Sequence, residues 1–255
     1  MRLAILSDVH GNPIALDAVL RDLEAQGGAD AHWVLGDFSA LGYDPATPLE
    51  RLTKLPGARF TRGNTDRYTV EEPRAPTIEA LAGEQARLDQ AVVLARTFGW
   101  TQGYLAATGW LDWLSGLDLE VRATLPDGTR LLGVHAAPGT DDGPGFNPRQ
   151  GDDEVRAALR GAEADLVIVG HVHYPQDRTV DGVRVVVTGG VSNPMADDLR
   201  AKYVLVEADA AGHRIERRFV EYDRAAVLDA LARARHPSAE YLGRFFRGEF
   251  RPPWS

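Results

Sequence analysis

Side chains that commonly bind metals occur in five short clusters, each directly after an apolar run of the sequence. The clusters are Asp8-Val-His10, Gly36-Asp37, Gly63-Asn64, the lone His135 and Gly170-His171-Val-His173. Together they offer two carboxylates, one amide oxygen and four imidazoles. This mixture of nitrogen and oxygen donors suits Mn²⁺, Fe or Zn²⁺ better than Ca²⁺, which prefers oxygen alone. The sequence therefore predicts a transition-metal site.

Each cluster taken singly has a more ordinary interpretation. An Asp-x-His pair after a strand is more often part of a turn, His135 alone fits a buried structural histidine, and Asn64 alone fits a turn residue. The joint pattern favours metal binding, because ligand-type residues recur in five places and glycine opens three of the clusters, which permits sharp turns. The other histidines, His32, His213 and His236, lie outside the pattern, and we interpret them as structural or surface residues.

The elements that must position these clusters follow an α/β order. Short apolar runs predict strands at 3–6, 33–35 and 59–61, with helices between them. Asn12 is the expected N-cap of the first helix, with Pro13 at its first position. This order predicts parallel strands with right-handed crossovers. Since ligand sites of open α/β sheets lie at the carboxyl ends of the strands, the clusters should meet at one sheet edge.

The rest of the chain is expected to complete one domain over residues 1–255. Residues from about 67 to 116 are helical by pattern, and form either an insertion beside the site or a set of core-packing helices. The predicted C-terminal part, about 223–255, is an amphipathic helix over 223–235 and an irregular tail. Further strands, joined in two places by Asp-Gly hairpin turns, are predicted at 120–125, 130–134, 166–169, 183–187 and 203–206.

Composition narrows the classes of protein. The net charge of −9 argues against binding long nucleic acid, which usually needs a basic face. The absence of cysteine excludes disulfides and thiolate zinc sites. No apolar run suggests a membrane span or a signal peptide, so we expect a cytoplasmic protein. The oligomeric state is open, because aromatic residues near the C-terminus are expected to pack either on the domain or on a second chain: Tyr241, Phe245, Phe246 and Phe250.

The five clusters, in this order, resemble the motifs of the calcineurin-like metallophosphoesterases over roughly residues 1–210. Ser7-Asp-Val-His-Gly-Asn-Pro, Arg62-Gly-Asn and Val191-Ser-Asn-Pro194 followed by Arg200-Ala-Lys-Tyr203 are similar to the small bacterial and archaeal phosphodiesterase-like branch. The resemblance implies an α/β fold, a four-layer αββα sandwich with the metals above the sheet edges.

The resemblance also implies how the ligands are divided between two divalent ions. One ion would take Asp8, His10 and His173, the other Asn64, His135 and His171, and Asp37 would bridge both. Mn²⁺ is favoured, with Fe, Zn²⁺ and Ni²⁺ as alternatives. A bridging carboxylate lets two cations lie about 3.5–4 Å apart, the spacing of two-metal phosphate chemistry.

The implied activity is hydrolysis of a small phosphorylated substrate, most simply a phosphodiester, by a metal-bridging hydroxide that attacks phosphorus in line. Asp37, Asn64 and His135 would be the catalytic residues, and Asn64, His135 and Asn12 the phosphate contacts. For Asn12 a plain N-cap is the stronger interpretation. The alternatives are a catalytically weak scaffold on the same fold and a nucleotide-sensing protein without turnover.

The sequence departs from the family pattern at Thr65, where many members carry a histidine that helps the leaving group depart. Threonine cannot serve as an imidazolium acid at neutral pH. We therefore predict weak activity on poor leaving groups and better activity on aryl or cyclic phosphodiesters. Asp66, beside it, either orients a metal ligand through a hydrogen bond or serves only the turn.

Specificity is expected to come from the walls around the metals. These walls would be the helical stretch of 67–116 and the loop of 140–150, which is rich in Gly, Pro and Asp and should be mobile and surface-exposed. Candidate substrate contacts beside the motifs, each with a structural or solvated alternative, are Arg62, Arg67, Arg149 and Tyr174.

Overall fold

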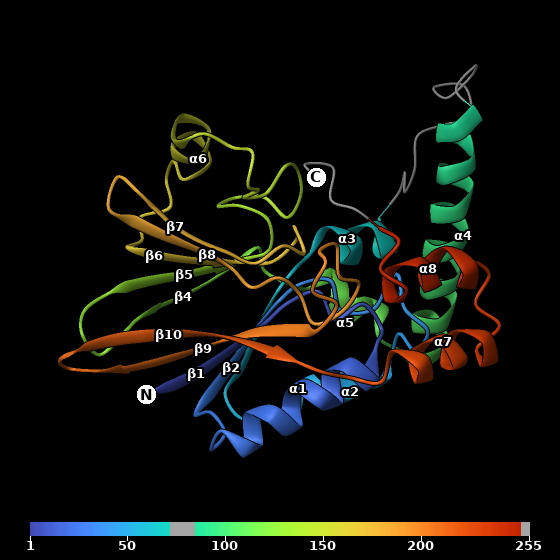
Figure 1. Cartoon of the computed structure of the whole chain (residues 1–255), viewed down its shortest axis with the longest axis horizontal. Helices are drawn as coiled ribbons and strands as arrows, with labels where there is room; N and C mark the ends of the chain where they lie inside the picture. Colours follow the sequence, from blue (N-terminus) through green and yellow to red (C-terminus); the bar gives the residue numbers. More distant parts are fainter. Residues whose placement is uncertain (72–84, 251–255) are drawn as a thin grey trace.

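The computed structural model describes residues 1–71 and 85–250 and contains two five-stranded sheets that lie face to face (Figure 1). The strands of the first sheet are, in order, β10 (Gly212–Val220), β9 (Ala201–Asp209), β1 (Arg2–Leu6), β2 (Ala31–Leu35) and β3 (Ala58–Thr61). Those of the second are β4 (Glu120–Thr124), β5 (Arg130–Val134), β6 (Leu166–Val169), β8 (Val183–Val187) and β7 (Gln176–Val180).

Helices cover the outer faces of both sheets and one end of the molecule (Figure 1). The helices α1 (Pro13–Ala25) and α2 (Thr47–Leu52) lie outside the first sheet, and α6 (Asp152–Ala158) lies outside the second. The others are α3 (Asn64–Val70), α4 (Gln85–Thr108), α5 (Leu111–Ser115), α7 (Arg224–Arg233) and α8 (Ala239–Phe246). The predicted four-layer αββα sandwich is confirmed.

The central strands of each sheet are parallel, as the alternation of strands and helices predicted. In the first sheet β1 pairs with β2 and β2 with β3, and in the second β5 pairs with β6 and β6 with β8. Next to them, β9 runs antiparallel to β1 in the first sheet, and β4 and β7 run antiparallel to β5 and β8 in the second. The edge strand β10 pairs antiparallel with β9. All the parallel strands of a sheet therefore end at the same edge, which is where the metal-ligand clusters begin.

Both faces of these strands are buried, which explains their continuous apolar runs. In β1, Leu3 and Ile5 face the second sheet and pack with residues such as Ile168 of β6. Ala4 and Leu6 face the opposite way and pack with residues of α1. The core between the sheets fixes their relative position, and with it the distance between the ligands that the two sheets carry.

Three elements were not predicted, and each has a physical reason. β10 alternates charged with partly buried residues and is an edge strand, so it lacks an apolar run. β7 is likewise a polar edge strand. α8 occupies the tail that we expected to be irregular, and it packs through Leu242 and Phe246 on α7. The C-terminal aromatic residues thus pack on their own domain.

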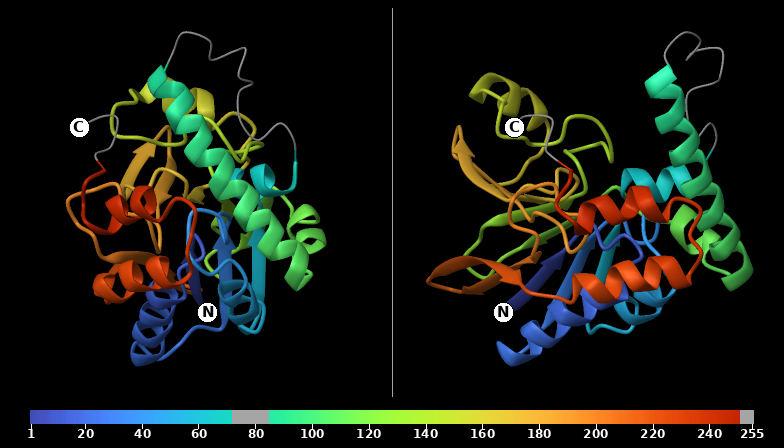
Figure 2. Two further views of the ribbon diagram at one scale, coloured as in Figure 1. Left: turned by 90° about the vertical axis from the view of Figure 1, so that its right-hand side faces the viewer. Right: turned by 45° about the vertical axis from the view of Figure 1, so that its right-hand side comes forward.

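The helical stretch after β3 contributes both to the core and to the surface. Leu105 of α4 and Leu114 of α5 are buried in the cluster beneath the first sheet. The first part of α4 projects from the body of the molecule (Figure 2). Across the part of the chain that the structure describes, no helix combines the length and apolar character that crossing a membrane requires.

Candidate metal centre

All seven predicted ligands meet at the edge where the parallel strands end. Asp8 and His10 follow β1, Asp37 follows β2, and Asn64 begins α3 just after β3. From the second sheet, His135 follows β5, and His171 and His173 follow β6. Asn64 and His171 are half-buried, and the other five are buried. The residues of the joint sequence pattern therefore lie together at one place in the structure.

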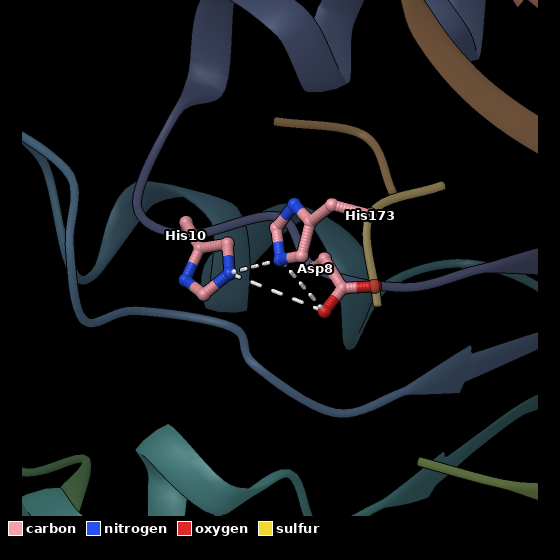
Figure 3. Close-up of side chains that lie close together, drawn as sticks. All are labelled: Asp8, His10 and His173. Carbon is pink, nitrogen blue, oxygen red and sulfur yellow. Dashed lines mark hydrogen bonds and ion pairs between the residues drawn. The ribbon is translucent and has the colours of Figure 1, made fainter. Parts of the chain in front are cut away.

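The first group of ligands is Asp8, His10 and His173, which point toward one another (Figure 3). The Nε2 atom of His173 lies 3.3 Å from Oδ1 of Asp8 and 3.2 Å from Nε2 of His10. The ligand atoms of the three all lie within 4.8 Å of one another. The two rings stack with their centroids 5.1 Å apart. This is the set that the resemblance assigned to one ion.

The second group is Asn64, His135 and His171. The side-chain oxygen of Asn64 lies 3.1 Å from Nε2 of His135 and 3.0 Å from Nδ1 of His171. Asp37 lies between the two groups, since its Oδ2 atom is 3.6 Å from Nε2 of His10 and 3.5 Å from Nε2 of His135. This is the position that a bridging carboxylate requires.

Each histidine of the centre has its other ring nitrogen against a backbone carbonyl. His10 faces the carbonyl of Ala40 at 2.8 Å, and His135 faces that of Leu35 at 2.6 Å. His171 faces the carbonyl of Gly143 at 2.9 Å, and His173 faces that of Ser192 at 3.0 Å. A carbonyl can only accept, so in the neutral ring the nitrogen beside it carries the proton and the nitrogen that faces the centre carries a lone pair. Four such nitrogens and two carboxylates form a donor set that fits divalent cations.

The backbone of the ligand loops is strained in the way functional sites often are. A positive φ is uncommon for residues other than glycine and costs free energy, which the surrounding structure must offset. Five of the seven ligands adopt it: Asp8 (55°), His10 (46°), Asp37 (58°), His171 (67°) and His173 (55°). The fold thus keeps these side chains aimed at one point against a local conformational preference.

The glycines of the motifs are needed for two different reasons. Gly36 has a φ of 79°, so the expected sharp turn is present there. At Gly63 a Cβ atom would lie 2.1 Å from Oδ1 of Asp37, and at Gly170 it would lie 2.6 Å from Cβ of Ser7 and 2.7 Å from Oδ2 of Asp8. Close approach to a ligand carboxylate, rather than turn conformation, therefore accounts for Gly63 and Gly170.

Burial and mutual charge shift the pKa of the ligands. Burial, together with the charge of Asp8, raises the pKa of Asp37 to about 7. Burial, together with the charge of His173, lowers the pKa of His10 to about 3. Burial alone would raise the pKa of Asp8, but the charge and hydrogen bond of His173 outweigh it and hold that pKa below its usual range. Two buried carboxylates side by side are costly, and cationic charge relieves that cost.

Asp66 and Asn12 have clear structural roles. Asp66 accepts hydrogen bonds from the N–H groups of Asp37 and Gly63 through Oδ2, at 2.8 and 2.9 Å, and so orients the loop of a ligand. Asn12 caps α1 by accepting from the N–H of Ala15 and donates to Ser192. Asn12 is fully buried, which agrees with the N-cap interpretation; its role as a phosphate contact stays a prediction.

Two of the candidate substrate contacts are engaged elsewhere. Arg62 and Arg67 both bind the carboxylate of Asp141, at 2.7 and 3.0 Å. This anchors the loop of 140–150, in which Asp141 and Phe146 are buried, so the expectation that the whole loop is surface-exposed was wrong. The same loop supplies the Gly143 carbonyl that orients His171. The candidates Arg149 and Tyr174 do not line the pocket at the centre.

A pocket of about 160 Å³ opens onto the centre. Thr65, where the sequence departs from the pattern of the resembled family, lines it, and within the described residues its buried hydroxyl makes no hydrogen bond. The other lining residues are His10, Asp37, Asn64, His171, His173, Leu41, Asn193, Met195 and Phe245. Sequence reasoning missed the last four. The apolar spacing of Leu242, Phe245 and Phe246 was the one signal that would have placed a helix there.

Comparisons with known proteins agree with this geometry. The profile described as the calcineurin-like phosphoesterase superfamily domain matches residues 1–211. A search of curated proteins found no match. The hypothetical protein PH1004 of Pyrococcus horikoshii is similar in fold, with a TM-score of 0.78 and 23% identity over 96% of this chain and 97% of that one. A metallophosphoesterase from Sphaerobacter thermophilus is also similar, with a TM-score of 0.71 and 26% identity over 97% of this chain and 99% of that one. The chain belongs to the calcineurin-like phosphoesterase superfamily.

Proposed function

We propose that the protein is a phosphodiesterase that depends on two divalent cations held at this centre. The observation that carries the proposal is the fixed orientation of four imidazoles, whose lone-pair nitrogens converge with the carboxylates of Asp8 and Asp37. Membership of the phosphoesterase superfamily supports it, and all seven ligand positions are filled by residues able to bind a metal.

The residues that would hold the first ion are Asp8, His10 and His173, and those for the second are Asn64, His135 and His171, with Asp37 shared. When bound, the cations supply Lewis-acid chemistry, because they make hydroxide available near neutral pH and neutralise the charge that grows on the phosphoryl oxygens. Mn²⁺ is the ion we propose; a nitrogen and oxygen donor set also accepts Fe, Zn²⁺ or Ni²⁺.

The protein groups contribute orientation and exclusion of water. The backbone carbonyls keep each imidazole in one tautomer, and Asp66 keeps the loop of Asp37 in place. Burial of the ligands strengthens every electrostatic interaction at the centre, since the local dielectric is lower than that of water. Asn64 and His135 lie together where the second ion and a phosphate oxygen would be bound, which is why we propose them as catalytic groups.

The leaving group must depart without help from an imidazolium acid. The imidazoles that line the pocket, His10, His171 and His173, are all proposed metal ligands, and Thr65 has no acidic proton at neutral pH. Substrates with leaving groups that are stable as anions therefore fit this site best, namely aryl and cyclic phosphodiesters.

The test is hydrolysis of bis(4-nitrophenyl) phosphate by the purified, metal-free chain with and without added Mn²⁺. We expect activity only with the metal, and a loss of at least about a hundredfold in Asp37→Asn and His135→Ala. His213→Ala is the matched control, because His213 binds Asp127 away from the centre. Undiminished activity in Asp37→Asn would overturn the proposal. Tight Mn²⁺ binding without hydrolysis would instead favour the scaffold or sensor alternative.

A further inference from the structure

The pocket at the metal centre is lined by both polar and apolar residues. The proposed ligands, Thr65 and Asn193 are polar, whereas Leu41, Met195 and Phe245 are apolar, and we call these three its apolar side. No lysine or arginine is among the described residues that line the pocket. The chemistry of the apolar side bears on which ester group can be bound next to the metals.

Phe245 is held rigidly in this wall. It lies in α8, and its side chain is buried against the cluster that joins α8 to α7. Its ring stacks on Phe250 with the centroids 4.0 Å apart and meets the edge of Tyr241. Figure 1 shows α8 beside the loops that follow the strand ends. The C-terminal helix thus presents a fixed aromatic surface to the site.

Leu41 is held in the wall by a strained turn. It has a φ of 66°, which is unfavourable for a bulky residue and persists only where the surroundings impose it. The next residue, Gly42, is packed so closely on the ligand loop that a Cβ atom there would lie 1.7 Å from the carbonyl oxygen of His10. The turn therefore keeps the Leu41 side chain at a set place relative to the metal ligands.

Asn193, which lines the pocket beside the apolar residues, already has its amide hydrogen-bonded. Asn193, which has a φ of 49°, donates from Nδ2 to the carbonyl of Leu41 at 3.1 Å and accepts from the hydroxyl of Ser192 at 3.0 Å. Arg62 and Arg67, which follow β3, are engaged by Asp141. A second phosphate or a carboxylate on the substrate would therefore be desolvated beside Leu41, Met195 and Phe245 without a cationic partner among the described lining residues.

We propose that the site takes phosphodiesters in which the ester group in this pocket is compact, uncharged and apolar, and that it rejects diesters that carry a further negative charge there. The inference rests on the proposed phosphodiesterase activity. Its physical basis is that burial of apolar surface against Leu41, Met195 and Phe245 stabilises the complex, whereas burial of an unpaired charge destabilises it through the loss of hydration. The small volume of the pocket, about 160 Å³, favours a compact group.

The experiment compares bis(4-nitrophenyl) phosphate with bis(3-carboxy-4-nitrophenyl) phosphate under saturating Mn²⁺. Both diesters are symmetric. In the carboxylated diester, a negative charge therefore enters the pocket whichever ester group is bound there. We expect the wild-type kcat/KM to favour the uncharged diester by at least about tenfold. Met195→Lys places a cation in the half-buried wall and should reduce this preference about tenfold, whereas Met195→Gln, which is uncharged and similar in length, should reduce it less.

Dividing the preference of the wild type by that of a variant removes the difference in intrinsic reactivity between the two diesters. Thermal unfolding and Mn²⁺ content of each variant check that the fold and centre are intact. Equal wild-type hydrolysis of both diesters, or a preference that Met195→Lys leaves unchanged, overturns the inference while the proposed activity stands. No hydrolysis of either diester by the metal-loaded wild type overturns the proposed activity itself, and the inference with it.

Discussion

The carboxylate of Asp66 accepts a hydrogen bond from the backbone N–H of Asp37, at 2.8 Å, across 29 residues of sequence. Its second oxygen accepts from the next N–H along that loop, at Phe38. The side chain of one acidic residue therefore fixes the backbone of the other, which lies between the two ligand groups. Groups that orient a metal ligand in this way often matter nearly as much as the ligand itself.

Asp66→Asn should weaken Mn²⁺ binding and kcat/KM by roughly ten- to a hundredfold. The amide keeps the size of the carboxylate but has only one accepting oxygen, so it cannot serve the N–H groups of both Asp37 and Phe38. Calorimetric titration with Mn²⁺ measures the effect. Asp153→Asn, at a fully solvated side chain on α6, is the matched control. Equal Mn²⁺ affinity in the wild type and Asp66→Asn would show that Asp66 serves only the turn.

Gly63→Ala should abolish most activity, because its Cβ would lie 2.1 Å from Oδ1 of Asp37 and must displace it. Gly103→Ala is the control, since its Cβ on α4 meets no atom within 4 Å and alanine favours a helix. We expect a loss of at least about a hundredfold for the first variant and none for the second. Full hydrolysis of bis(4-nitrophenyl) phosphate by Gly63→Ala would mean that Asp37 has no fixed place in the reaction.

Asp141→Asn should affect one metal more than the other. Asp141 ties the loop of 140–150 to Arg62 and Arg67, and that loop orients His171 through the Gly143 carbonyl. His171 belongs to only one of the two proposed ligand sets. In a calorimetric titration, one equivalent of Mn²⁺ should bind about tenfold more weakly and the other should keep its affinity. Equal weakening of both equivalents would contradict this division of the ligands.

His236 should make the fold less stable in mild acid. Burial lowers its pKa to about 4, against 6.5 in the unfolded chain, and its ring packs on Trp100. Above pH 6.5 the imidazole of His236 is neutral in both the folded and the unfolded chain. Between pH 6.5 and 4 it binds a proton in the unfolded chain but not in the folded one, so the free energy of unfolding decreases as the pH falls through that range. The full effect is on the order of 3 kcal/mol.

The measurement is urea unfolding at pH 7 and pH 4.5 for the wild type and His236→Gln. Glutamine does not titrate and can still accept from the N–H of Ser238, which the ring Nδ1 does in the wild type. The free energy of unfolding should fall more steeply with acid in the wild type than in the variant. Parallel pH dependence of the two proteins would show that His236 titrates normally in the fold.

The absence of an imidazole at Thr65 should make the rate depend steeply on the leaving group. We expect 4-nitrophenyl diesters to react far faster than dialkyl phosphates, because an alkoxide needs a proton that none of the described residues lining the pocket is proposed to supply. The check is kcat/KM across phenyl diesters of graded leaving-group pKa, with dimethyl phosphate as the limit. A flat dependence would point to a proton donor other than the lining residues.

The convergence of the candidate ligands was predictable from the sequence because each cluster lies within a few residues after a strand, and parallel strands bring their carboxyl ends to one edge. Asp8 and His173 illustrate this, since they are far apart in the chain yet 3.3 Å apart in space. The same reasoning could not place Leu41 or Asn193, whose positions depend on left-handed turns that the sequence does not announce with a glycine at either residue.

Long-range polar contacts were equally out of reach. Arg62 and Arg67 look like free cations beside a motif, and only the fold shows that Asp141, more than 70 residues away, engages both. β10 was missed because an edge strand with a solvated face needs no apolar run. The core strands and the types of candidate ligand can therefore be predicted from local sequence patterns. The walls of the pocket cannot, because they arise from packing between distant segments.

The most direct test of the two-metal account is the rate of bis(4-nitrophenyl) phosphate hydrolysis by the metal-free chain as Mn²⁺ is added in known equivalents. We expect the rate to rise until two equivalents per chain are bound and then to stay constant, whereas Asp37→Asn should show neither the rise nor the plateau. Full activity in the metal-free chain, or a plateau at one bound equivalent, would contradict it.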